Sequence, residues 1–173
     1  MAMLLDANVF IEAKNRYYGF DFCPGFWRWI ERAAEADVAW SLSRVEDELV
    51  GRDDPLAAWV RERRDVLFKP LGNQILPAIA ELSAWTQGQS YRPAAVQTFF
   101  ESADFYLIAY AKTHGHNVVT LETPSDGVKR VKIPEPCLAM GVRFLTPFQM
   151  LRECGVRLDL GNPEDLPGQL SLL

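Results

Sequence analysis

The sequence lacks the features that identify several classes of protein. No apolar run approaches the roughly 20 residues that a membrane-spanning helix needs. The N-terminus runs from Met1 into a short apolar stretch without the layout of a signal peptide. The three cysteines are odd in number, widely spaced and outside any CxxC pair, so neither a disulfide framework nor a structural zinc site is expected. These absences predict a cytoplasmic protein that does not contact a membrane.

Glycine-rich phosphate loops are also missing, since the sequence contains neither GxxxxGK[ST] nor GxGxxG. Basic charge is scarce: Lys and Arg number 18 against 23 Asp and Glu, for a formal net charge of −5. This balance argues against tight, sequence-independent binding of nucleic acid through a basic surface. It is compatible with a nuclease, because an acidic site can hold divalent cations while a local basic patch contacts the phosphates.

The composition that is present fits one globular domain, with 49% hydrophobic and 24% charged residues over 173 positions. Strand-like and helix-like segments alternate, which predicts an α/β layered domain with a mostly parallel sheet and right-handed crossovers. We assign this domain to residues 1–155 and a loosely ordered tail to 156–173. The predicted strands are 3–6, 38–42, 117–121, 129–133 and 142–145, and the predicted helices are 8–15, 24–36, 43–51, 54–64, 76–87, 93–100, 103–114 and 146–154.

Capping signals support three of the helix starts. Ser43 with Glu46 three residues later has the pattern of a capping box. Ser102 can cap the apolar helix 103–114, and Thr146 can cap the last helix.

Acidic side chains gather where this fold would place a ligand, beyond the carboxyl ends of the strands. Asp6 ends the first strand, Thr120 and Glu122 end the strand 117–121, and Asp104 lies in the first turn of the helix that precedes that strand. An acid directly after two leucines is costly unless it is used. We therefore expect Asp6 to be functional.

A fourth acid comes from the helix that begins at residue 43. With Val45 at the centre of the buried stripe, Glu48 lies about 60° away and Asp47 about 160° away, so Glu48 is expected to face inward. Four converging carboxylates would repel one another, and Mg²⁺ or Mn²⁺ would remove that conflict because these cations prefer oxygen ligands. Such a site can hydrolyse phosphodiesters, since the metal orients and deprotonates water.

Each acid also has an ordinary explanation. Asp104 alone would favour a helix N-terminus through the dipole, Glu48 alone would be a solvated surface residue, and Glu122 alone would be a loop acid. The prediction depends on the combination.

Four segments, in order, resemble the motifs of PIN-domain nucleases: residues 5–11 (LDANVFI), 45–49 (VEDEL), 102–104 (SAD) and 118–122 (VVTLE). The most familiar type is the VapC-like toxin ribonuclease of prokaryotic toxin–antitoxin pairs. Residues 11–18, 24–27 and 131–134 look like a less characterised prokaryotic subfamily. The resemblance spans about residues 3–154.

The resemblance implies a three-layer, Rossmann-like PIN fold and an endoribonuclease that depends on Mg²⁺ or Mn²⁺. It assigns Asp6, Glu48 and Asp104 to the metal site, Glu122 as the fourth catalytic acid, and Asn8 and Thr120 as supports. The fourth acid of PIN domains is usually Asp or Asn, so the longer Glu122 leaves open whether it binds the metal directly or through water. A toxin would have RNA as substrate, a cognate antitoxin that blocks the site, and a homodimer as its expected assembly.

Basic residues near the expected acidic site are candidates for holding RNA. The segment 123–140 is longer than in a compact PIN toxin, and it carries Lys129, Arg130 and Lys132. Alternation would place Arg130 and Lys132 on one face of a strand and Lys129 on the other. An edge strand guarded by charge is the alternative. Lys14, just after the first strand, could reach a phosphate or simply extend along apolar surface.

Other functions remain open at this level. A phosphatase with Asp6 as nucleophile would want a second acid two residues on, where this chain has Asn8. A catalytically silent PIN-like module would keep the acids as structure while it binds protein or RNA. The pair His114 and His116 is not expected to bind metal, because a helix C-terminus favours imidazole by its dipole alone.

Overall fold

A five-stranded, fully parallel sheet forms the centre of the molecule. In the computed structural model, which describes residues 1–158, the strands lie in the order β3-β2-β1-β4-β5. Met3 on the central strand pairs with Ala39 on one side and Asn117 on the other. The strands are β1 (Met3–Leu5), β2 (Ala39–Leu42), β3 (Phe68–Lys69), β4 (Asn117–Val119) and β5 (Phe144–Leu145).

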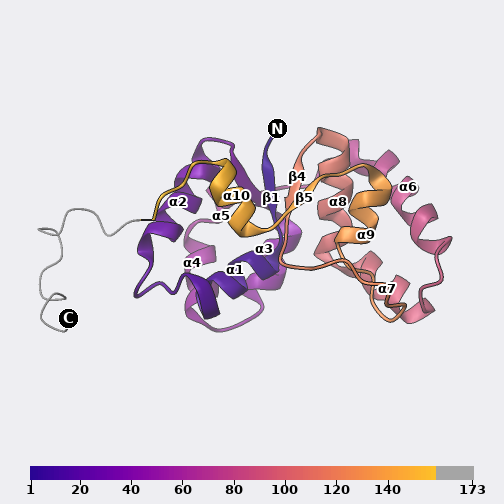
Figure 1. Cartoon of the computed structure of the whole chain (residues 1–173), viewed down its shortest axis with the longest axis horizontal. Coiled ribbons are helices and arrows are strands. Elements are labelled where there is room, and N and C mark those ends of the chain that lie inside the picture. The colour runs from indigo at the N-terminus through magenta and orange to yellow at the C-terminus, as the bar shows by residue number, and fades with distance from the viewer. Residues whose placement is uncertain (159–173) are drawn as a thin grey trace, which may run out of the picture.

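The central strands are hydrophobic without alternation because helices cover both faces of the sheet. Leu4, Leu5, Val118 and Val119 are completely buried. In Figure 1 the labelled strands β1, β4 and β5 run through the middle, with α2, α4, α5 and α10 on one side and α6 to α9 on the other. The helices are α1 (Ala7–Glu12), continued by a π-helix (Ala13–Tyr17), α2 (Pro24–Glu35), α3 (Ser43–Val50), α4 (Pro55–Glu62), α5 (Arg64–Leu67), a 3-10 helix (Asn73–Ile75), α6 (Leu76–Gln87), α7 (Pro93–Glu101), α8 (Ala103–His114), α9 (Pro134–Met140) and α10 (Pro147–Glu153).

Several predicted elements are confirmed. Helices α6 and α8 have the predicted bounds, and α8 ends at Gly115, whose φ of 66° is the left-handed conformation that glycine adopts at little cost. Helix α10 begins with a complete capping box between Thr146 and Gln149. The predicted α/β class with a parallel sheet is therefore correct.

Two predicted caps, Ser43 and Ser102, form no side-chain capping bond. The N-cap of α3 is Leu42, and Ser43 is already the first helical residue without a side-chain capping bond. Ser102 is the N-cap of α8, but its hydroxyl donates to the carbonyl of Phe99 at 2.7 Å instead of capping. The amide of Ala103 donates to the carboxylate of Glu48 at 3.0 Å, so a distant side chain takes the capping role.

The strand predicted at 129–133 is wrong as well. Val131 and Ile133 are buried, but they anchor a loop to the core instead of joining a ladder. Prolines at 134 and 136 then favour the helix α9, which the sequence analysis did not predict. The edge strand β3 was also missed, because two residues are too short for a pattern.

The last described residues continue the packing of α10. The amide of Val156 donates to the carbonyl of Leu151 at 2.9 Å, and Val156 packs against the core. Most of the predicted tail, 156–173, lies outside the described residues. Within residues 1–158, no helix is long and apolar enough to cross a membrane.

Candidate functional site

Asp6 lies at the carboxyl end of β1 and is held by a hydrogen-bond network. Its side chain is buried, and the Thr120 hydroxyl donates to Asp6 Oδ2 at 3.0 Å. The side chain of Asn8 donates in turn from Nδ2 to Thr120 Oγ1 at 3.0 Å, and its Oδ1 accepts from the backbone amide of Leu121 at 3.0 Å. These hydrogen bonds join the ends of β1 and β4 and hold the Asp6 carboxylate in place.

Asp6, Asp104 and Glu48 line a single cavity of about 240 Å³, which we call the acid cavity. Asp104 reaches it from the first turn of α8 and Glu48 from α3. Glu48 Oε1 accepts from the amide of Ala103, which ties α3 to the start of α8. Its complete lining is Asp6, Ala7, Asn8, Ile11, Glu48, Ser102, Asp104 and Arg130.

The inward orientation predicted for Glu48 is wrong in one respect. Glu48 is exposed at the rim of the acid cavity, and Glu46 is the buried acid of α3, with a 2.8 Å ion pair to Arg64. The buried stripe of α3 consists of Val45, Glu46 and Leu49, so its centre lies further toward Glu46 than the sequence analysis assumed.

Burial and the repulsion between neighbouring carboxylates disfavour the ionised forms of Asp6 and Asp104. Burial raises the pKa of Asp6 to about 7; the hydrogen bond from Thr120 lowers it, and the charges of Glu122 and Glu48 raise it. The pKa of Asp104 is raised well above its ordinary value by burial first, and then by the charges of Asp6, Glu122 and Glu48. The positive charge of Arg130 lowers the pKa of Asp104, but it is the smallest of these influences. The site would gain from an additional positive charge.

Glu122 is occupied by contacts to the loop that follows it. Its Oε2 accepts from the amide of Ile133 at 2.8 Å, and its Oε1 lies 2.5 Å from Arg130 Nη2. Glu122 is absent from the lining of the acid cavity. Its carboxylate closes the 122–133 loop and acts on Asp6 and Asp104 through its charge.

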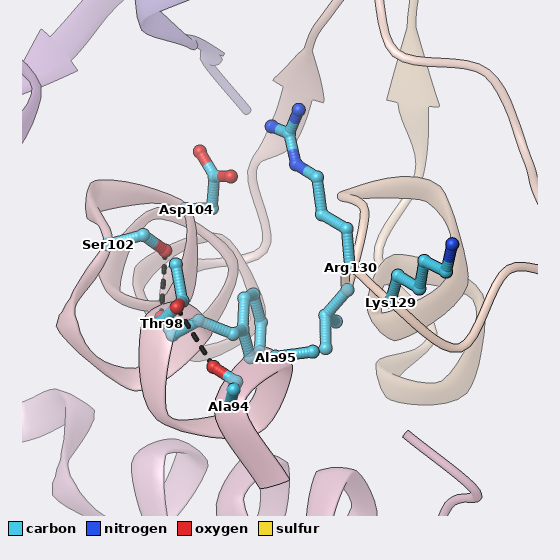
Figure 2. A pocket seen from close by; sticks show the side chains of 9 residues that line it. Ala94, Ala95, Thr98, Ser102, Asp104, Lys129 and Arg130 are labelled. Atoms are coloured by element: carbon cyan, nitrogen blue, oxygen red, sulfur yellow. Dashed lines mark hydrogen bonds between the residues drawn. The ribbon is translucent and has the colours of Figure 1, made fainter. Parts of the chain in front are cut away.

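The basic residues are arranged differently from the alternation predicted for a strand. Arg130 and Lys129 both border a second cavity, next to Asp104 (Figure 2). Lys132 instead donates to the carbonyl of Thr123 at 3.4 Å, within the same loop. Lys14 forms a 3.4 Å ion pair with Asp54 and is outside the lining of the acid cavity.

Oxygen donors suited to Mg²⁺ or Mn²⁺ are present, although residues 1–158 contain no group of three or more His, Cys, Asp or Glu in an arrangement that could hold a metal ion. Mg²⁺ keeps several waters and needs only one or two carboxylates from protein. The buried carboxylate of Asp6 and the half-buried carboxylate of Asp104 have raised pKa values, and Glu48 stands at the rim. Arg130 is the one basic residue in the lining, so this group of oxygens fits that requirement.

Other candidate groups have structural roles. His116 Nδ1 accepts from the amide of Ala2 at 3.3 Å, and its ring meets Trp40 edge to face. Burial raises the pKa of the Cys137 thiol, so it is a poor nucleophile. The sequence analysis missed Thr98 and Ala94, which border the second cavity, because nothing distinguishes them from other residues of an amphipathic helix.

Comparison with known proteins gives a family match and two similar folds. The family model described as "Domain of unknown function (DUF4411)" matches residues 3–158. No curated protein matches the chain. Among solved structures, VapBC2 from Rickettsia felis bound to a DNA fragment from its promoter is similar with a TM-score of 0.54 and 14% identity, over 84% of this chain and 98% of that chain. FitAcB from Neisseria gonorrhoeae is similar with a TM-score of 0.51 and 18% identity, over the same shares. At these identities the likeness concerns the fold, and it confirms the VapC-like PIN fold that the motifs predict.

Proposed function

We propose that this chain, which belongs to the DUF4411 family, is a metal-dependent endoribonuclease and the toxin of a type II toxin–antitoxin pair. The observation that carries the proposal is the meeting of Asp6, Asp104 and Glu48 in one cavity at the carboxyl ends of parallel strands. Three acids from separate elements, two of them with raised pKa values, are difficult to explain as structure alone.

The proposed reaction is hydrolysis of an RNA phosphodiester. Asp6 and Asp104 would hold Mg²⁺ or Mn²⁺, with Glu48 contributing from the rim. The bound ion would supply an activated water and charge neutralisation at the scissile phosphate. Thr120 and Asn8 fix the orientation of the Asp6 carboxylate. Arg130 lines the same cavity and is the side chain placed to contact a phosphate oxygen.

The proposal extends to partners and location. The fold shared with VapBC2 and FitAcB, together with the motifs that resemble VapC-like toxins, supports a cognate antitoxin for this chain. Such a partner would inhibit by covering the acid cavity. We further propose a cytoplasmic protein that acts on RNA and forms a homodimer, with Arg130, Lys132 and Lys14 as candidate RNA contacts.

Binding of Mn²⁺, followed by water-proton relaxation, tests the metal site without knowledge of the RNA. We expect saturable binding that Asp6→Asn and Asp104→Asn each weaken by about tenfold or more. Asp53→Asn, which removes an exposed acid outside the cavity, is the matched control and should bind like wild type. Absence of binding at millimolar Mn²⁺ would overturn the proposal.

A catalytically silent PIN-like module is the second candidate. It is favoured by the backbone contacts of two acids, since Glu48 accepts from Ala103 and Glu122 from Ile133. In that case Asp6→Asn and Asp104→Asn would retain every cellular effect of the wild type. The phosphatase alternative has less support, because the Asn8 side chain is bonded to Thr120 and Leu121.

A further inference from the structure

A second cavity of about 380 Å³ lies beside the acid cavity, between helix α7 and residues 129–131; we call it the α7 cavity. The two cavities share Ser102, Asp104 and Arg130 in their linings. A molecule in the α7 cavity would therefore lie directly beside the carboxylates. The volume of the α7 cavity is within the range of about 300–1,000 Å³ that is usual for small-ligand sites.

The inner wall of the α7 cavity is apolar. Ala95, Phe99 and Val131 are buried residues whose side chains border it. Ala94, an exposed residue in the first turn of α7, also borders the cavity. The two alanines leave space that a larger side chain would fill, so the wall suits a flat apolar face such as that of a nucleobase.

Polar groups stand on two sides of this apolar wall. The Thr98 hydroxyl donates to the carbonyl of Ala94 at 2.9 Å, and the Ser102 hydroxyl donates to that of Phe99 at 2.7 Å. Because each hydroxyl proton is used, each oxygen is left to accept from a ligand. Figure 2 shows Arg130 across the cavity from Thr98 and Ser102, with its guanidinium toward the end where Asp104 lies.

We propose that the α7 cavity binds one unpaired nucleotide of the substrate, next to the phosphodiester that is cut. The base of this nucleotide lies against the apolar wall, and the N–H groups of the base face Thr98 and Ser102. The phosphate of the nucleotide lies toward Arg130. This inference rests on the proposed nuclease function.

Binding of the four ribonucleoside 5′-monophosphates, measured by calorimetry or ligand-observed NMR without divalent cation, tests the cavity separately from catalysis. We expect saturable binding of at least one nucleotide and weaker binding of ribose 5-phosphate, which lacks the base. Ala94→Trp and Thr98→Trp fill the cavity from exposed positions and should each weaken nucleotide binding by about tenfold or more, equivalent to about 1.4 kcal/mol. Gln97→Trp, on the same helix but outside the cavity lining, is the control and should bind like wild type.

Thr98→Val tests the hydroxyl alone, because it keeps the size of the side chain. It should change the order of preference among the four nucleotides more than the affinity for ribose 5-phosphate. Absence of nucleotide binding, equal binding of ribose 5-phosphate, or unchanged binding in both tryptophan variants would overturn the inference.

Cleavage assays separate this inference from the proposed function. If nucleotides bind in an Ala94-dependent way but no RNA is cut, the nuclease proposal fails and the binding cavity stands. If RNA is cut with the same rate and sequence preference in Ala94→Trp as in wild type, the nuclease proposal stands and the cavity inference fails.

Discussion

The hydroxyl of Thr120 donates a hydrogen bond to Asp6 Oδ2 at 3.0 Å, across 114 residues of sequence. The hydroxyl oxygen of Thr120 itself accepts from Asn8 Nδ2 at 3.0 Å and from the backbone amide of Glu122 at 3.1 Å. Thr120 thus joins the ends of β1 and β4 and stabilises the charged form of the buried aspartate.

Thr120→Val should lower the free energy of unfolding by about 1–3 kcal/mol, because it removes these contacts from buried partners. The loss should be larger at pH 8 than at pH 5, since the lost hydrogen bond favours the ionised form of Asp6. Chemical denaturation at both pH values measures this. Thr120→Ser keeps the hydroxyl and serves as the control; a Ser variant as unstable as the Val variant would contradict the assignment.

Stability without divalent cation should fall as the pH rises from about 4 to about 7. An aspartate in the unfolded chain has a pKa near 3.9 and is ionised over most of this interval. Folded Asp6, with a pKa of about 7, still binds a proton there, so raising the pH favours the unfolded state. Above pH 7 the loss is complete and the contribution levels off. A pKa difference of one between the two states corresponds to about 1.4 kcal/mol.

Asp6→Asn should remove this part of the pH dependence, and added Mn²⁺ should reduce it in wild type. Urea denaturation from pH 4 to pH 8 measures both effects. Identical pH profiles for wild type and Asp6→Asn would show that Asp6 does not titrate in this interval.

We expect Glu122 to contribute more to the local stability of the 122–133 loop than to the affinity for a metal ion. Glu122→Ala removes the acceptor of the Ile133 amide, so hydrogen exchange at Ile133 should accelerate by about tenfold, as expected for a lost hydrogen bond of about 1.4 kcal/mol. Glu122→Gln keeps an acceptor and should exchange more slowly than the Ala variant. Its lost ion pair should cost little, because Arg130 is 66% exposed. A loss of Mn²⁺ affinity as large as in Asp6→Asn would identify Glu122 as a ligand instead.

Glu46 and Glu48, two residues apart on α3, should separate stability from activity. Arg64→Ala leaves the buried Glu46 without its ion-pair partner and should cost about 1 kcal/mol of stability with RNA cleavage unchanged. Glu48→Gln keeps an acceptor for Ala103 and should reduce cleavage with little effect on stability. Thermal denaturation and a cleavage assay on both variants test this pair.

The sequence was sufficient for the central strands β1 and β4 because Leu4, Leu5, Val118 and Val119 form short apolar runs between helical patterns. It also predicted the meeting of Asp6, Asp104 and Glu48, since parallel topology brings the strand ends to one edge. The neighbourhood of Glu122 could not be predicted, because its bond to Ile133 depends on how a loop returns to the core.

Two local errors have physical causes. Val131 and Ile133 alternate with Arg130 and Lys132 as strand residues would, but alternation records only which side chains are buried, and a loop that follows a surface buries the same set. Ser102 and Ser43 have the residue type of a cap, yet Ser102 bonds Phe99 and Ser43 lies one position inside the helix. Residue type permits a cap without deciding between competing hydrogen bonds.

The pairing of β1 with β4 also bears on synthesis. Met3 and Leu5 align with Asn117 and Val119, so the middle of the sheet consists of strands more than 110 positions apart. Contacts of such long range form late and slow the search for the native state. An emerging polypeptide consequently carries Asp6 from the start but has no acid cavity until α8 and β4 have left the ribosome. If the chain is a toxin, this order leaves a period in translation during which it is harmless to the RNA around it.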